Sequence, residues 1–231
     1  MSVLGVVVMA LAVLGEDPGG RAVLDSVAGV LGSVEDYTVQ LEITAEMERI
    51  SVAPMEATLY YKRPDRMHVE ADGVAMIPRE VLPVSLAALP ENFSVERMER
   101  DSLEGRETIR LWLQARHANT RTRSLTLSVD PSRWVPLELT ASSVTGRTVT
   151  AAFTFTAVDG FWLPEEVVIR LDAVAEDTSE VPSWEQRAPS GRRGGVPRRG
   201  TVRILYQDYR VNTGLPDAIF SGSGGGEGKR D

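Results

Sequence analysis

Apolar and polar residues alternate strictly along one long segment near the start of the chain. Its apolar positions, each separated from the next by one polar residue, are Tyr37, Val39, Leu41, Ile43, Ala45 and Met47. A period of two predicts a β-strand with one buried face and one solvated face. Seven further runs alternate in the same way, at 55–61, 67–71, 109–113, 125–129, 149–157, 167–171 and 202–206. The pattern therefore predicts a mainly β protein.

Short turn signals separate these runs. They are Arg63-Pro64-Asp65, Glu104-Gly105, Asp130-Pro131-Ser132, Thr145-Gly146 and Asp159-Gly160. Connections this short join neighbouring antiparallel strands, because a parallel pair needs a crossover of a dozen or more residues. The expected sheet is an antiparallel meander.

Two segments follow a helical period instead. Apolar residues at 23, 27, 30, 31 and 34 form one stripe and predict a helix over 21–34, which Gly29 and Gly32 weaken. The segment 78–90 predicts one or two short helices, broken by Pro83. The complete pattern is therefore mainly β, in the α+β class.

So few helices cannot cover one apolar face of eight strands. A curved sheet that is half covered by helices leaves an apolar concavity suited to acyl chains. The expected lining residues, on the apolar side of the first three strands, are Leu41, Ile43, Met47, Leu59, Tyr61 and Val69. Four methionines would give this surface adaptable packing, or would serve as ordinary core: Met47, Met55, Met67 and Met76.

The ends of the chain and one internal segment differ from the strands in composition. Residues 3–14 are almost entirely apolar, too short to span a bilayer but typical of a secretory signal, so we expect a signal peptide over 1–16. A single domain is expected over 17–220. Within it, 176–200 predicts a disordered basic loop between two strands, and 221–231 predicts a flexible tail.

Charge and cysteine content narrow the function. The net charge is −8, which argues against general binding of nucleic acid, a polyanion. The chain has no cysteine, which excludes disulfides, thiol catalysis, thiolate metal sites and a lipid anchor on cysteine. Arginines at 187, 192, 193, 198, 199 and 203 make the loop region basic, so it either contacts anionic lipid headgroups or is simply solvated.

The chain offers little for catalysis. It has no G-x-S-x-G elbow, phosphate-binding loop, dinucleotide fingerprint or zincin helix. His68 alternates with Glu70 and Asp72, which is either a solvated strand face or a metal-dependent enzyme site. Adjacent carboxylates at Glu165 and Glu166 point to opposite faces of a strand. We expect no catalytic residue, no metal and no cofactor, and the enzyme hypothesis on His68 remains the alternative.

Several segments in order resemble one known family. They are ATLYYKRPDRMHVEA at 57–71, LSVDPSRWVPLELTA at 127–141, TAAFTFTAVDG at 150–160 and YRVNTGLPDAIF at 209–220. With the preceding helix, they resemble the LolA/LolB-like superfamily of bacterial lipoprotein carriers over about 21–220. The segment after the DG at 72–73 departs from the family, whose carriers have an aromatic-rich strand there.

The resemblance implies an incomplete, curved antiparallel barrel whose helices act as a lid over an apolar cavity. Family members carry lipoprotein acyl chains through the periplasm and pass them to an outer-membrane acceptor. Arg63 matches the lysine-arginine-proline motif, whose arginine bonds helix carbonyls and holds the lid closed, and Met67 matches a position at the cavity mouth. The implied protein is a soluble periplasmic monomer that meets an inner-membrane donor and an outer-membrane acceptor. The alternative is a periplasmic sensor or protein-interaction module on the same fold.

Overall fold

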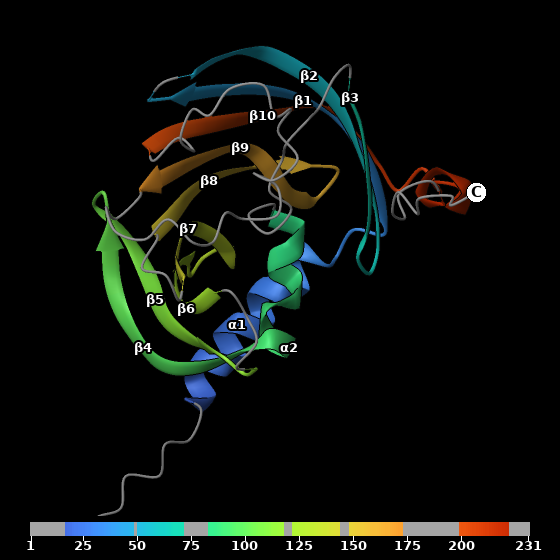
Figure 1. Cartoon of the computed structure of the whole chain (residues 1–231). Helices are drawn as coiled ribbons and strands as arrows, with labels where there is room; N and C mark the ends of the chain where they lie inside the picture. Colours follow the sequence, from blue (N-terminus) through green and yellow to red (C-terminus); the bar gives the residue numbers. More distant parts are fainter. Residues whose placement is uncertain are drawn as a thin grey trace, which may run out of the picture.

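A computed structural model describes residues 17–48, 50–71, 83–117, 122–143, 148–172 and 199–221. Within these ranges, ten strands and four helical segments follow one another (Figure 1). They are α1 (Pro18–Leu31), β1 (Asp36–Met47), β2 (Ile50–Lys62), β3 (Arg66–Ala71), η2 (Pro83–Ala88), α2 (Leu89–Asn92), β4 (Phe93–Leu103), β5 (Arg106–Ala115), β6 (Thr122–Asp130), β7 (Val135–Ser143), β8 (Thr148–Val158), β9 (Phe161–Asp172), β10 (Arg199–Val211) and η4 (Asp217–Phe220).

All ten strands form one antiparallel sheet. Its order is β3-β2-β1-β10-β9-β8-β7-β6-β5-β4, so β3 and β4 are its edges and the described strands do not close a barrel. The one pairing between strands distant in sequence joins β1 to β10, with Tyr37 opposite Val211 and Met47 opposite Gly200. The predicted fold class, a mainly β incomplete barrel built as an antiparallel meander, is confirmed.

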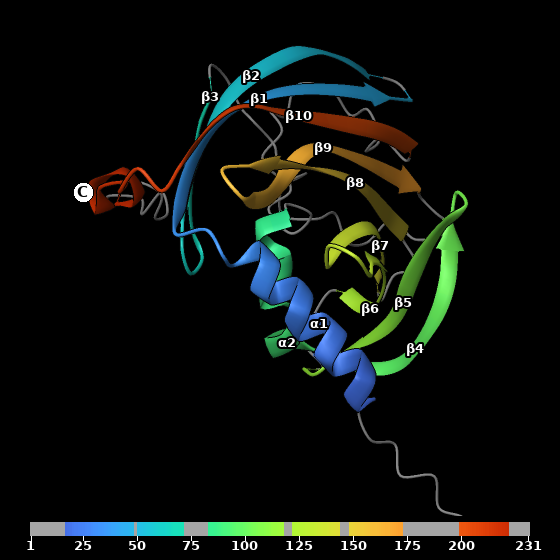
Figure 2. The same ribbon diagram turned by 180° about the vertical axis from the view of Figure 1, so that it is seen from behind.

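The sheet curves around the helices (Figures 1 and 2). Both views show α1, η2 and α2 on its concave side, next to the end of the sheet that β4 and β5 form. Leu24 and Val27 of α1 are fully buried there, together with Leu111, Leu127 and Ile204 of the sheet. Alternation along the strands places these apolar side chains on one face, so the concave side contains a single hydrophobic core.

Helix α1 begins three residues before the predicted start at 21 and ends three residues before the predicted end at 34. Asp17 accepts hydrogen bonds from the backbone N–H groups of Gly19 and Gly20, and Pro18 takes the first helical position, where its missing N–H costs nothing. The helix ends at Gly32, whose N–H bonds the carbonyl of Ala28. Capping, which apolar periodicity does not report, therefore sets both ends.

The sheet contains two strands that the alternation analysis did not predict. In β4 only Phe93 and Val95 are buried, and most of the later residues are exposed, so the strand lacks a regular apolar repeat. In β7 the repeat exists at Val135, Leu137 and Leu139, directly after a turn. Strand β10 begins at Arg199, inside the range 176–200 predicted as loop, because its ladder with β9 extends to the pair Arg199–Asp172.

Several predictions lie outside the described residues. These are the signal peptide, most of the 176–200 loop, the 221–231 tail beyond Ser221, the turn at 145–146 and the side chains of Asp72 and Met76. The single-domain assignment of 17–220 likewise stays a prediction. The turns at Glu104-Gly105 and Asp159-Gly160 are confirmed, with positive φ at each of these four residues.

The last described segment is bound to the start of the sheet. Asp36, a buried carboxylate on β1, accepts hydrogen bonds from the N–H groups of Thr213, Gly214 and Leu215, at 2.9, 3.0 and 3.3 Å. Lys62 donates to the carbonyl of Leu215 at 2.7 Å and also pairs with Asp217. The segment after β10 is thereby held against β1 and β2.

Candidate functional site

The predicted lining residues of the early strands fall into two groups in the structure. Leu41, Ile43, Leu59 and Tyr61 are buried in the concave core, with at most 5% of each side chain exposed. Their partners across the β2–β3 ladder, Val69 opposite Leu59 and Met67 opposite Tyr61, are half-buried and pack against the core. The structure therefore brings six of the eight predicted site residues onto one continuous apolar surface.

Helices lie on the concave side of the sheet, where α1 contacts β4, β7 and β9 and α2 contacts β4. Leu24 and Val27 of α1 have no exposed area, and Leu86 of η2 and Leu89 of α2 are also buried. Gly20 allows the close approach of α1 to β4, because a Cβ there would lie 2.5 Å from Cγ1 of Val95. A ligand that uses the part of the concave face under α1 has to displace this helix.

Arg63 connects the sheet to the end of α1. Its Nη1 donates to the carbonyl of Gly32, the residue that caps the helix, at the long distance of 3.4 Å. The backbone N–H of Arg63 also bonds the carbonyl of Glu35 at 2.8 Å. The last turn of α1 contains no basic residue, so the Arg63 guanidinium supplies the positive charge that a helix C-terminus favours.

A cluster of four tyrosines lies next to this connection. The rings of Tyr37 and Tyr61 are 5.0 Å apart, those of Tyr37 and Tyr209 are 5.6 Å apart, and Tyr206 stacks on Tyr209 at 6.5 Å. The hydroxyl of Tyr61 donates to the carbonyl of Pro64, in the turn that holds Arg63. We call Tyr37, Tyr61, Tyr206 and Tyr209 the tyrosine cluster.

The hydroxyls of the tyrosine cluster differ in their partners. Tyr209 donates to the carbonyl of Pro164 at 2.7 Å. The hydroxyl of Tyr206 is buried and makes no hydrogen bond in the part of the chain that the structure describes. Burial raises the pKa of Tyr37, Tyr206 and Tyr209 above the ordinary value of 10.0, so these hydroxyls keep the proton with which they can donate a hydrogen bond.

The pattern of apolar and polar positions does not mark Tyr206 and Tyr209 as site residues. Tyr206 occupies an apolar position in its strand, but Tyr209 follows at an odd spacing. The register between β1 and β10 shifts between Thr38 and Gln40, opposite Asp208, whose φ is +54°. This bulge turns Tyr209 to the same side as Tyr206. The position of Tyr206 in an alternating run is the sequence signal that could have identified it. No pattern in the sequence predicts the bulge that turns Tyr209 inward.

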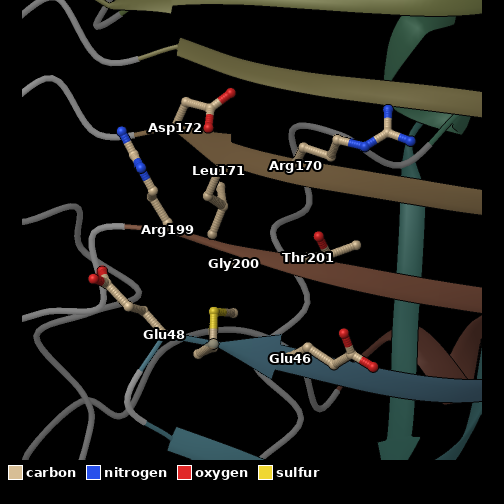
Figure 3. Close-up of a pocket in the computed structure, with 9 residues that line it drawn as sticks. Glu46, Glu48, Arg170, Leu171, Asp172, Arg199, Gly200 and Thr201 are labelled. Carbon is tan, nitrogen blue, oxygen red and sulfur yellow. The ribbon is translucent and has the colours of Figure 1, made fainter.

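Met47 lies apart from the other predicted lining residues. It borders an open surface hollow of about 440 Å³ at one end of β1, β9 and β10 (Figure 3). Glu46, Glu48 and Asp172 line this hollow together with arginines at 170 and 199. The mixture of opposite charges does not suit an acyl chain, so we separate this hollow from the candidate site.

His68 takes part in a polar group on the sheet surface. Its Nε2 lies 3.6 Å from a carboxylate oxygen of Glu70, and its ring contacts that of Tyr60, whose hydroxyl donates to Glu70. Within the described ranges, no three His, Cys, Asp or Glu side chains are arranged to hold a metal ion. Asp72, the third residue of the enzyme hypothesis, lies outside those ranges.

Comparison with known proteins identifies the fold. A DUF1329 family protein of Desulfovibrio piger is 12% identical and superposes with a TM-score of 0.66 over 89% of this chain and 97% of its own. A LolA superfamily protein of Nitrosomonas europaea is 13% identical, with a TM-score of 0.61 over 87% of this chain and 97% of its own. A Vibrio parahaemolyticus domain described as an outer membrane lipoprotein-sorting protein is 12% identical, with a TM-score of 0.63 over 88% and 96%.

No protein-family model and no curated protein matches the sequence. The likeness to solved structures is therefore one of fold, and this chain has the LolA-like fold that the sequence resemblance implied. Across the described residues, no helix is both long and apolar enough to cross a bilayer.

Proposed function

We propose that this protein is a non-enzymatic carrier that holds the acyl chains of lipoproteins or lipids on its concave face. The observation that carries the proposal is the covering of a continuous apolar sheet face by three short helical segments instead of a second sheet. Helices that contact the sheet mainly through apolar side chains can be exchanged for an acyl chain, because each buried methylene contributes about 0.8 kcal/mol.

The proposed cycle has a closed and an open state. In the closed state α1 packs on the concave side against β4, β7 and β9, and Arg63 bonds the Gly32 carbonyl. In the open state α1 moves away and acyl methylenes replace Leu24 and Val27 in the core. The proposed site contains Arg63 and Met67 at its rim, and Leu41, Ile43, Leu59, Tyr61 and Val69 on its floor. We place Met47 outside it.

The setting of the carrier is part of the proposal. The fold is shared with a Vibrio parahaemolyticus domain described as lipoprotein-sorting. For this chain we propose a monomer that works in the periplasm. It would receive its cargo from an inner-membrane donor and deliver it to an outer-membrane acceptor. No cofactor is required for this cycle, because the acyl chain passes from one apolar environment to another without a covalent step.

An engineered disulfide that holds α1 against β4 and can be reduced again tests the proposal. A Cβ on Gly20 would lie 3.3 Å from the Cβ of Val95, close to the 3.5–4.5 Å of a disulfide, and the chain has no other cysteine. In Gly20→Cys/Val95→Cys, the oxidised protein is expected to take up a fluorescent fatty acid much more slowly than the reduced protein. Equal uptake in both redox states would show that α1 does not cover the binding site.

Material that co-purifies with the protein gives an independent test. Organic extraction followed by mass spectrometry is expected to find acylated molecules in a stoichiometric amount. Absence of lipid, together with no saturable binding of the fluorescent fatty acid by the wild-type protein, would contradict the carrier function.

A second function is favoured by the dense packing of the concave face, where Leu24, Val27 and Val39 have no exposed area. A periplasmic sensor or protein-interaction module could keep this core closed and bind a partner on its outer surface. Capture of one stoichiometric protein partner by a lipid-free preparation would support this function over the carrier.

A further inference from the structure

The hydroxyl of Tyr206 is an isolated polar group within the concave core. Only 6% of the residue is exposed, and within the described part of the chain its oxygen has no hydrogen-bond partner. A buried hydroxyl without a partner destabilises the folded state, because it loses its bonds to water and gains none. A phenylalanine would fill nearly the same space without this cost.

The hydroxyls of two neighbouring tyrosines have hydrogen-bond partners within the protein. Tyr209 stacks on Tyr206 and donates to Pro164, and Tyr61 donates to Pro64, so both hydroxyls are satisfied by backbone carbonyls. Tyr206 lies opposite Leu41 on the floor of the proposed site. We therefore expect a molecule that enters the site to supply the hydrogen-bond acceptor that Tyr206 lacks.

The chemistry of that molecule follows from the donor. A protonated phenol in this core, with apolar side chains and other tyrosines around it, offers one O–H and no charge, and it suits an uncharged acceptor attached to an apolar chain. An ester or amide carbonyl meets this description, whereas a plain hydrocarbon has no acceptor. Resting on the carrier function above, we propose that Tyr206 donates a hydrogen bond to the acyl carbonyl of an ester- or amide-linked acyl chain.

Three fluorescent probes of equal chain length test this assignment: a methyl ester, an N-methyl amide and a hydrocarbon. Wild-type protein is expected to bind the ester, the amide or both about three- to tenfold more tightly than the hydrocarbon, the range of one neutral hydrogen bond. The two carbonyl probes distinguish an ester-linked from an amide-linked source. Tyr206→Phe is expected to remove the preference and to leave binding of the hydrocarbon unchanged.

Stability measurements accompany the binding measurements. Tyr206→Phe is expected to unfold at the same temperature as the wild type or higher, because it removes an unsatisfied hydroxyl. Tyr209→Phe is the matched control, since it loses the bond to Pro164 and is expected to lose stability while keeping the preference for carbonyl probes. A labelled ester carbonyl should also show a lower infrared stretching frequency when bound to the wild type than when bound to Tyr206→Phe.

The possible failures are distinguishable. Equal affinity of the wild type for carbonyl and hydrocarbon probes, or an equal loss for all three probes in Tyr206→Phe, overturns the role of the hydroxyl and leaves the carrier function standing. Absence of saturable binding of all three probes by the wild type overturns both. The wild-type comparison alone decides the matter if a variant does not fold.

Discussion

Asp36 is a buried carboxylate whose bonds join the first strand to the last described segment. Three consecutive N–H groups, from Thr213 to Leu215, converge on its two oxygens, and the side chain of Asn212 accepts the N–H of Glu35 in return. Neutral amide donors satisfy the charge without another ion. This single side chain therefore fixes how the chain leaves β10.

Replacing this carboxylate should destabilise the protein. In Asp36→Ala the three N–H groups lose their acceptor inside the structure, and the expected loss is about 2–3 kcal/mol of unfolding free energy. Urea denaturation followed by circular dichroism measures it. Glu42→Ala, which removes an exposed carboxylate of the same strand, is the control and should change stability by less than about 0.5 kcal/mol. Equal effects of the two substitutions would contradict the role of Asp36.

Arg63 should affect opening more than folding. Its side chain is exposed and, among the residues that the structure describes, bonds the Gly32 carbonyl at a long distance, so Arg63→Leu should change the unfolding free energy by less than about 0.5 kcal/mol. The proposed cycle has that bond only in the closed state, so its loss should speed uptake of a fluorescent fatty acid, measured by stopped-flow. Arg210→Leu, on the exposed face of β10, should take it up at the wild-type rate. An unchanged rate in Arg63→Leu would remove Arg63 from the lid mechanism.

The sequence predicts the burial of some residues and the contacts of others, but not all contacts. The burial of Leu41 and Leu59 follows from alternation alone, because a period of two assigns each residue to a face. The contact of Arg63 with a helix carbonyl agrees with what the family resemblance implied. The partners of Asp36 lie more than 170 residues away in the sequence, and no local pattern reports such a contact.

At the scale of elements, α1 packs tightly against the sheet near its start and has open space beside it near its end. A Cβ at Gly20 would lie 2.5 Å from Val95, while a Cβ at Gly29 would meet nothing within 4 Å. Alanine normally stabilises a helix relative to glycine, by about 0.5–1 kcal/mol. The two glycines should therefore respond to the same substitution in opposite directions.

The pair of substitutions tests how α1 sits on the sheet. Gly29→Ala should raise the unfolding free energy by about 0.5–1 kcal/mol. Gly20→Ala should lower it by about 1–3 kcal/mol, because the methyl group overpacks the contact with Val95. Thermal unfolding of both variants measures the difference, and Val95→Ala should partly rescue Gly20→Ala. Stabilisation by Gly20→Ala would show that α1 does not approach β4 this closely.

Elements with a regular repeat were predictable and the others were not. Eight strands followed from alternation, and β7 carried the same signal. Strand β4 forms an edge of the sheet, where the outer residues remain solvated and the repeat disappears after Val95. Its place in the sheet depends on pairing with β5, from Phe93–Ala115 to Leu103–Arg106, and on the main-chain bond from Asp17 to Val95. Both are tertiary effects.

At the scale of the whole molecule, acid should loosen the closing segment. Hydrogen bonds from Lys62 and Arg66 lower the pKa of Asp217 below its ordinary value of 3.8. A lowered pKa means that these contacts contribute fully above the ordinary value and are lost as the pH falls through the lowered one. Carbon-13 NMR of the Asp217 carboxyl group should show a midpoint below 3.8, moving upward in Lys62→Met. A wild-type midpoint at or above 3.8 would contradict the ion pairs.

The pairing of β1 with β10 determines when the sheet can form as one unit during synthesis. The ribosome makes β1 long before β10, so β1 has an unpaired edge beside apolar side chains until β10 emerges, and β9 has one from its own synthesis until then. Sheets that depend on such distant pairings fold in milliseconds to seconds, slower than helical proteins of the same size. During that interval the growing chain offers these free edges to any chaperone that recognises extended apolar segments, and pairing with β10 removes them.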